Sequence, residues 1–242
     1  RKAGKPLVVV LMNGRPLCLE SVDKQADAML EAWFPGTQCG NAVADVLFGD
    51  IVPAAKLTAS FPLTEGQIPN NYNYKRSGRP GDMPYSSTVR HIDVPNRNLY
   101  PFGYGLSYTT FSYGEMQCPT AFDKKGFLPV SVDVTNTGNY DGEEIVQLYV
   151  ADKVASMVRP IKELKGFQKV FIPKGQTKRV EFKLNVKDLG FWNSLMQYVV
   201  EPGTFEIMVG TNSEELQKKE AVWDDGKVSE APSARVRVVV QH

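Results

Sequence analysis

The chain has 242 residues, of which 42% are hydrophobic and 23% charged, and its formal net charge at pH 7 is +1. This composition is typical of a globular protein with one large domain or two ordinary ones. The balanced charge gives no reason to expect nucleic acid or an anionic membrane as a partner. No apolar run approaches the roughly 18–20 residues that a membrane-spanning helix needs.

The cysteines and histidines limit the chemistry further. Three cysteines occur at spacings that match no zinc or redox motif, and their odd number argues against a complete disulfide framework. Cys18 and Cys39 lie among apolar residues, which predicts inert buried thiols. With only two histidines, a His-rich metal site is excluded.

The N-terminal stretch RKAGKPLVVVLMNG places basic residues before an apolar run. That run, Val8 to Met12, is shorter than the roughly 7–15 residues of a signal-peptide core, so it indicates a strand. Because the chain does not begin with Met and starts just before this strand, we expect it to be part of a longer protein.

The residue pattern of the first 64 residues is typical of an α/β fold. The expected elements are a strand over Pro6–Met12 buried on both faces, an ambiguous helix or strand over Ala26–Phe34, a helix over Asn41–Phe48 ended by Gly49, and a strand over Lys56–Phe61 closed by Pro62. Residues 65 to about 110 are then rich in Pro, Asn, Gly, Ser and Tyr, which predicts a long connection. Its aromatic stretch YPFGYGLSYTTF (100–111) is expected to pack against a neighbouring domain.

From Phe111 onward the hydrophobic period changes to two. Three valines alternate with polar residues over 130–135, and similar alternation recurs over 179–184 and 205–210. Turn sequences such as NTGNYDG (136–142) and PKGQ (173–176) bound these runs. The pattern predicts an antiparallel β-sandwich. The last stretch, RVRVVVQ (235–241), is either an added edge strand or a tail.

The stretch EAWFPGTQCGNAVADVLFGD (31–50) raises the question of a glycine-rich ligand cradle. Gly36 and Gly40 before a helix suit an anion site, but no GxGxxG or Walker lysine is present. We therefore favour a tight turn into a helix whose first amides are satisfied by Thr37 and Asn41.

The sequence offers residues for three other kinds of site. A glycosidase pair of carboxylates has possible members in the acidic residues of the first third, but no spacing forces two together: Glu20, Glu31, Asp45, Asp50 and Glu65. Nucleophilic catalysis fails for want of a GxSxG and of histidines. In NYNYKRSGRP (71–80), Tyr72, Arg76 and Arg79 suit sugar binding, although the same groups also suit an interdomain strap.

Several long blocks, in chain order, resemble family 3 glycoside hydrolases, especially the bacterial-type β-glucosidases and β-xylosidases. They are VVVLMNGRPLCL (8–19), ADAMLEAWFPGTQCGNAVADVLFGDIVPAAKLTASFP (26–62), YPFGYGLSYTTF (100–111), VTNTGNYDGEEIVQLYV (134–150), RPIKELKGFQKVFIPKGQT (159–177) and EPGTFEIMVG (201–210). Two departures are Cys39 and Ala55, which stand where the family usually has Gly.

The resemblance implies the C-terminal portion of an α/β sandwich over residues 1–64, a linker or strap over 65–111, and a fibronectin type III-like antiparallel β-sandwich with a tail over 112–242. It also makes residues 26–33 a strand. In such enzymes the aspartate nucleophile lies in an upstream barrel, and the acid/base glutamate precedes the strand that matches 8–12. No residue here therefore inherits a catalytic role, and no metal or cofactor is implied.

We therefore expect the C-terminal fragment of a retaining exo-β-glycosidase that hydrolyses terminal β-glucosyl or β-xylosyl units and is inactive alone. The β-linked substrate would bind through the missing N-terminal part. Self-association or a complementing chain is expected at the incomplete sheet edge. The family habit and the few cysteines favour a periplasmic or secreted bacterial parent. The alternative is a non-catalytic carbohydrate-binding or protein-interaction module; an independent nucleotide-binding domain lacks a phosphate loop.

Overall fold

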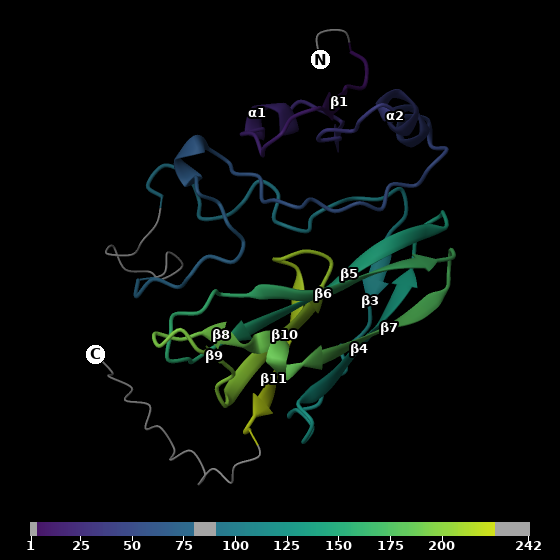
Figure 1. Cartoon of the computed structure of the whole chain (residues 1–242). Coiled ribbons are helices and arrows are strands. Elements are labelled where there is room, and N and C mark those ends of the chain that lie inside the picture. The colour runs from purple at the N-terminus through teal and green to yellow at the C-terminus, as the bar shows by residue number, and fades with distance from the viewer. Residues whose placement is uncertain (1–3, 80–90, 226–242) are drawn as a thin grey trace, which may run out of the picture.

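The computed structural model describes residues 4–79 and 91–225, and these form three parts in chain order (Figure 1). We call residues 4–64 the α/β part, residues 65–79 with 91–110 the strap, and residues 111–225 the sandwich. In Figure 1 the α/β part lies above, the sandwich lies below, and the strap runs between them. The predicted C-terminal element over 235–241 lies outside the described residues. None of the described helices is long and apolar enough to cross a membrane.

The α/β part contains two parallel strands that pair with each other. In the sequence, one helix lies between the two strands and another follows the second strand. Strand β1 (Val8–Leu11) pairs with β2 (Ala28–Glu31), with the short helix α1 (Glu20–Asp23) between them. The predicted strand at 6–12 is therefore confirmed, but its predicted burial on both faces is wrong for the described residues, since Val8 is 47% exposed. Parallel strands are buried when layers cover both faces, and a two-stranded sheet leaves this one open.

Helix α2 (Cys39–Phe48) confirms the predicted helix after the Pro-Gly turn. It ends at Gly49, whose φ of 85° is the left-handed conformation that glycine adopts without a Cβ clash. The predicted start is wrong: Gln38 is the N-cap and makes no side-chain capping bond. The Asn41 amide instead donates to Gln38 Oε1 at 2.8 Å, so neither expected side chain satisfies the first amides.

The predicted strand over 56–61 forms no strand: residues 58–59 bend, and Phe61 makes only an isolated bridge to Tyr100. The segment pairs instead with the strap: Leu57 N donates to Tyr104 O at 2.7 Å, and Phe61 N donates to Tyr100 O at 2.8 Å. A left-handed turn at Gly103 (φ 80°) permits this pairing. The prediction of a sheet strand is therefore wrong, because the backbone partners lie far along the chain, in the strap.

The sandwich consists of two antiparallel sheets. One has the order β11-β10-β5-β6 and the other β3-β4-β7. Their bounds are β3 (Phe111–Tyr113), β4 (Phe127–Asn136), β5 (Gly142–Asp152), β6 (Glu163–Ile172), β7 (Thr177–Asn185), β10 (Gly203–Gly210) and β11 (Leu216–Trp223). Between β7 and β10 lie the 3-10 turn η2 (Val186–Leu189) and a small hairpin of β8 (Phe191–Trp192) and β9 (Tyr198–Val199).

The predicted alternation is confirmed in three strands of the sandwich. The inward residues of β4, β7 and β10 form one buried core: Val130, Val132, Val134, Val180, Phe182, Leu184, Phe205, Ile207 and Val209. The outward neighbours in β7 are polar and exposed, as a sheet with one solvated face requires. In β10 the outward Met208 is instead buried, because it packs with Tyr149 against Tyr72 and Phe102 of the strap. The prediction of buried thiols is wrong for Cys18, which is exposed, and Cys39 is only partly buried.

Candidate functional site

The acidic residues considered for glycosidase chemistry are spread over separate elements. Glu20 lies on α1 and is paired with Lys24 at 2.7 Å, whose hydrogen bond and charge lower the pKa of the Glu20 carboxyl. Glu31 lies at the end of β2, and its Oε1 accepts from Trp33 N at 2.9 Å. Asp45 is on α2, Asp50 follows it, and Glu65 begins the 3-10 turn η1 (Glu65–Gln67). Glu20 and Glu31 are thus each engaged with a neighbour of their own, and the five carboxylates lie on separate segments of the chain.

The turn at residues 33–36 has a packing role. Trp33 adopts a φ of 50° and packs against Phe61, with ring centroids 5.8 Å apart. The Phe34 ring lies against Gly14, where an added Cβ would come within 2.5 Å of the ring. The interpretation of this stretch as a structural turn rather than a ligand cradle agrees with these contacts.

The strap is held to the sandwich by aromatic stacking. The Tyr72 ring stacks on Phe102 at 4.2 Å and meets Tyr149 edge-on at 5.9 Å. The Tyr72 hydroxyl accepts from Leu164 N at 3.2 Å. Tyr149 is fully buried in β5, so the predicted packing of the stretch at 100–111 against a neighbouring domain is confirmed.

The structure thus separates the residues that the sequence grouped at 71–80. Tyr72 is engaged in packing, whereas Arg76 and Arg79 are exposed on the strap. The backbone beyond Tyr72 is tied to the sandwich, because Ile161 N donates to Tyr74 O at 3.0 Å. The two arginines therefore lie on a segment that is anchored at its start and presents cations to solvent.

A buried ionic cluster joins all three parts, and we call it the polar seam (Lys56, Gly105, Tyr113, Glu144 and Thr211). Lys56 Nζ lies 3.3 Å from Glu144 Oε2, and only 10% and 5% of the two side chains are exposed. Lys56 comes from the α/β part, and Glu144 from β5 of the sandwich. A buried pair of this kind is tolerated only when further hydrogen bonds satisfy both groups.

The polar seam meets that requirement. Lys56 Nζ also donates to the Gly105 carbonyl of the strap at 3.1 Å and to Thr211 Oγ1 at 2.9 Å. Glu144 Oε1 accepts from Thr211 Oγ1 and from the Tyr113 hydroxyl, each at 2.8 Å. Burial and the Glu144 charge raise the pKa of the Tyr113 phenol above its ordinary value.

Gln147 makes a second link beside the polar seam. Its Nε2 donates to Gly103 O at 3.1 Å and to Thr211 O at 2.6 Å, while its Oε1 accepts from the Tyr149 hydroxyl. A Cβ at Gly103 would lie 2.2 Å from this amide, so glycine permits the close approach. The strap is therefore fixed through its backbone carbonyls, which do not depend on strap side chains.

A cleft of about 560 Å³ opens beside the polar seam, between the strap and the sandwich. Lys56 and Glu144 lie in its wall, but their charges are paired with each other. Ser107 and Glu215 also line the cleft, and the Ser107 hydroxyl has no hydrogen-bond partner among the described residues. The hydrogen bonds and the ion pair of the polar seam hold the α/β part, the strap and the sandwich in one orientation.

The polar seam is not predicted from the sequence, although the sequence contains one signal for it. Glu144 has the same strand parity as Val146, Leu148 and Val150, which are all buried in the core. A carboxylate at an inward position of a strand needs a buried partner. The partner itself, 88 positions earlier in the chain, has no sequence signal.

Comparison with known protein families gives two matches. Residues 1–108 match the family described as "Glycosyl hydrolase family 3 C-terminal domain", and residues 144–213 match the "Fibronectin type III-like domain". The first match covers the α/β part and nearly all of the strap. The second covers most of the sandwich from β5 onward.

Individual relatives agree with these matches. The chain is 49% identical over 222 residues to the "Periplasmic beta-glucosidase" of Salmonella typhimurium, and 46% identical over 213 residues to the "Beta-xylosidase" of Formosa agariphila. These alignments cover 90% and 88% of this chain but 29% of each relative. The crystal structure of a beta-glucosidase from Listeria innocua in complex with glucose superposes with a TM-score of 0.86 at 41% identity, over 91% of this chain and 31% of that one.

Proposed function

The chain belongs to the family 3 glycoside hydrolases, of which it is a C-terminal part, and we propose that it supports the hydrolysis of terminal β-glucosyl or β-xylosyl units without supplying the reacting carboxylates. The relatives named as β-glucosidases and β-xylosidases support this substrate class. A structure of the Listeria innocua β-glucosidase has been solved with laminaribiose bound.

We propose that the reacting groups come from outside the described residues. Retaining hydrolysis requires two carboxyl groups about 5–5.5 Å apart, one as nucleophile and the other as acid and then base. The acidic residues of the α/β part lie on separate elements and are engaged individually, as Glu20 with Lys24 and Glu31 with Trp33 N. On this account the chain is inactive alone and needs neither a metal nor an organic cofactor.

The proposed role of the chain is to build and orient the catalytic part of the whole protein. Residues 1–64 would complete an α/β sandwich, 65–111 would form its strap, and 112–242 would form the fibronectin type III-like domain with its tail. The polar seam supports this role, because it fixes the α/β part against the sandwich. Arg76 and Arg79 would lie at the rim of the substrate site, available to sugar hydroxyls, and the packing of Tyr72 would anchor the segment that carries them.

Two further proposals concern partners and location. The open edges of the β1–β2 pair would take further strands, either from the rest of the protein or from another chain. The Salmonella relative is named as periplasmic, and we propose a periplasmic or secreted setting for the whole protein.

The test is to incubate the purified 242-residue chain with p-nitrophenyl β-glucoside and p-nitrophenyl β-xyloside and to follow nitrophenol release. We expect no turnover above an empty-vector preparation carried through the same purification. Turnover that copurifies with the chain and disappears in Glu31→Gln or Asp45→Asn would contradict the proposal, because one of the described carboxylates would then be catalytic.

A further inference from the structure

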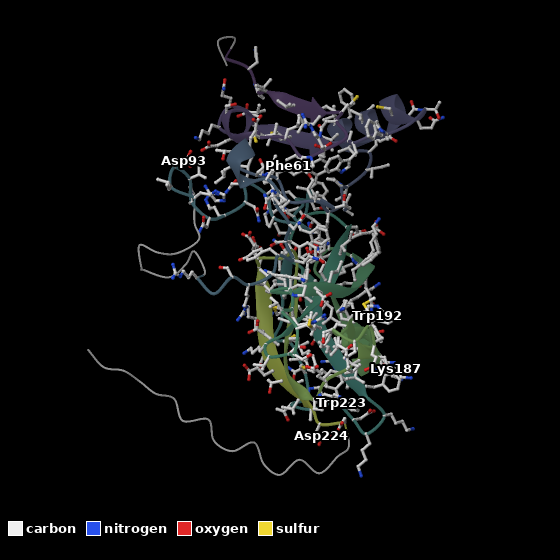
Figure 2. All side chains as sticks on the ribbon, turned by 60° about the vertical axis from the view of Figure 1, so that its left-hand side comes forward. Phe61, Asp93, Lys187, Trp192, Trp223 and Asp224 are labelled. Atoms are coloured by element: carbon white, nitrogen blue, oxygen red, sulfur yellow. The ribbon has the colours of Figure 1, made fainter. Side chains whose placement is uncertain are left out.

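The hairpin β8–β9 presents two large aromatic rings to solvent. Trp192 and Tyr198 face each other across the hairpin, and their side chains are 61% and 52% exposed. Their ring centroids lie 5.7 Å apart with an interplanar angle of 66°. Figure 2 shows Trp192 at one edge of the sandwich, near Lys187 and well away from Phe61 at the junction with the α/β part. The packing of the three parts therefore leaves these rings uncovered.

The hairpin holds the Tyr198 ring in place, and the Trp192 ring packs against it. The Tyr198 hydroxyl donates to Lys187 O at 3.0 Å, and its ring lies against Gly190, where a Cβ would come within 2.5 Å. Beneath them, Phe191 is buried and carries the Arg159 guanidinium 4.6 Å above its ring. Because the hairpin already orders these rings, binding of a ligand costs little side-chain conformational entropy of the protein.

The turn of the hairpin is fixed in the same manner. Asn193 Oδ1 accepts from Leu195 N at 2.9 Å and from Gln197 N at 3.0 Å. The whole run GFWNSLMQYVV (190–200) contains no charged residue, in a chain that is 23% charged. The surface thus combines aromatic faces with neutral amide and hydroxyl groups, which suits a ligand that is uncharged and amphipathic.

A pyranose ring in a β-linked chain has that chemistry. Its C–H faces stack on aromatic rings, while its hydroxyls take hydrogen bonds from neutral polar groups. We propose that Trp192 and Tyr198 form a saccharide-binding site on the sandwich for β-linked glucosyl or xylosyl chains. The preference for these sugars rests on the proposed function, whereas the aromatic site itself does not.

The angle between the two rings limits which β-linked polysaccharides fit the site. Rings that bind the flat face of crystalline cellulose need to lie in one plane, and these two form a corner of 66°. Such a corner accepts one sugar unit on a ring face with the second ring at its side. The site is therefore suited to soluble or twisted β-glucans and xylans, and not to crystalline cellulose.

The exposed aliphatic side chains at the tip of the hairpin distinguish a saccharide ligand from a protein partner. Leu195 and Met196 are 74% and 77% exposed, and Val158 of the β5–β6 loop is 61% exposed. A protein docked on this surface would bury such aliphatic groups at its centre. Binding of a saccharide would depend on the two rings and little on the hairpin tip. Substitutions in the rings and at the tip therefore distinguish a bound saccharide from a docked protein.

The experiment is native affinity electrophoresis of the 242-residue chain in gels containing laminarin or arabinoxylan, together with a pull-down on microcrystalline cellulose. The variants are Trp192→Ala, Leu195→Ser and, as an exposed aromatic control elsewhere, Tyr140→Ala, which is 58% exposed. Circular dichroism establishes that each variant is folded. We expect the chain to be retarded in at least one soluble polysaccharide and not to bind cellulose.

We expect Trp192→Ala to weaken the retardation about tenfold, since a stacked ring contributes up to roughly 1.5 kcal/mol, and the other two variants to behave as the parent chain. The site is refuted if the parent chain is not retarded, or if Trp192→Ala is retarded as strongly. If Leu195→Ser weakens the retardation as much as Trp192→Ala, the surface is a protein contact. The same conclusion follows if sedimentation velocity shows a dimer that both Trp192→Ala and Leu195→Ser abolish. None of these outcomes bears on turnover, so the proposed function is tested independently.

Discussion

The α/β part and the sandwich differ in how far each encloses its own apolar side chains. The sandwich has one core shared by both sheets, with Phe205 and Ile207 at most 2% exposed. In the described α/β part the buried large apolar side chains are Leu19, Phe61 and Leu63, whereas Phe34 and Phe48 are 83% and 84% exposed. Two antiparallel sheets can close a core between them, while a pair of parallel strands needs layers on both faces.

This difference indicates how the stability of the chain is distributed. The sandwich is expected to be a cooperative unit, and the α/β part to depend on the strap, on the polar seam and on whatever else covers its open faces. Phe61 belongs to the junction, because its ring meets both Trp33 and Tyr100 of the strap. The predictions below test this division.

The largest effect is expected from Phe205→Ala, with Phe48→Ala as the matched control. Removing a buried Phe leaves a cavity and costs about 3–5 kcal/mol in the free energy of unfolding, whereas Phe48 is 84% exposed and should cost less than about 1 kcal/mol. Urea unfolding followed by circular dichroism measures both. Equal losses in the two variants would mean that the α/β part also has a closed core.

Lys56→Met should have the next largest effect, because it leaves the Glu144 carboxylate buried without its cation. We expect a loss of about 3 kcal/mol in the free energy of unfolding, and recovery of most of it in the double variant Lys56→Met/Glu144→Met. The neighbouring glutamate on β5 gives the control. Glu143 pairs with Lys169 at the surface, with side chains 39% and 50% exposed, so Lys169→Met should cost less than about 1 kcal/mol.

The smallest effect is a pH dependence at Tyr113. Because burial and Glu144 raise the pKa of this phenol in the folded state, its contribution to stability is complete below the ordinary value of 10.0 and is lost as the pH rises above that value. Tyr113→Phe should therefore make the fall in melting temperature above pH 10 shallower.

Tyr140→Phe, at an exposed phenol, is the control and should leave the slope unchanged. An unaltered slope in Tyr113→Phe would show that other groups dominate alkaline unfolding.

Local pattern predicted the elements that local chemistry determines. The alternation of Val130, Val132 and Val134 gave the inward face of β4, and Gly49 gave the end of α2. The resemblance resolved the strand β2, where Ala28, Met29 and Leu30 favour a helix by propensity. In each of these cases the signal lies within a few residues of the element it specifies.

The remaining features depend on pairings between distant residues. Leu57 belongs to no sheet of the α/β part because its backbone partners, Gly103 and Tyr104, lie on the strap. Lys56 and Glu144 meet only when three parts of the chain are assembled. Tyr72 was grouped with Arg76 by sequence, but stacking on Phe102 gives it a packing role that no local pattern reveals.

Amide hydrogen exchange on the 242-residue chain tests the contrast between the two regions most directly. The account predicts that amides of β4, β5, β7 and β10 exchange slowest, at the rate set by global unfolding of the sandwich, and that amides of β1 and β2 exchange orders of magnitude faster through local opening. The amides of Leu57 and Gly103 should lie between these limits. Protection of β1 and β2 equal to that of β5 would contradict the account, because the α/β part would then be as self-sufficient as the sandwich.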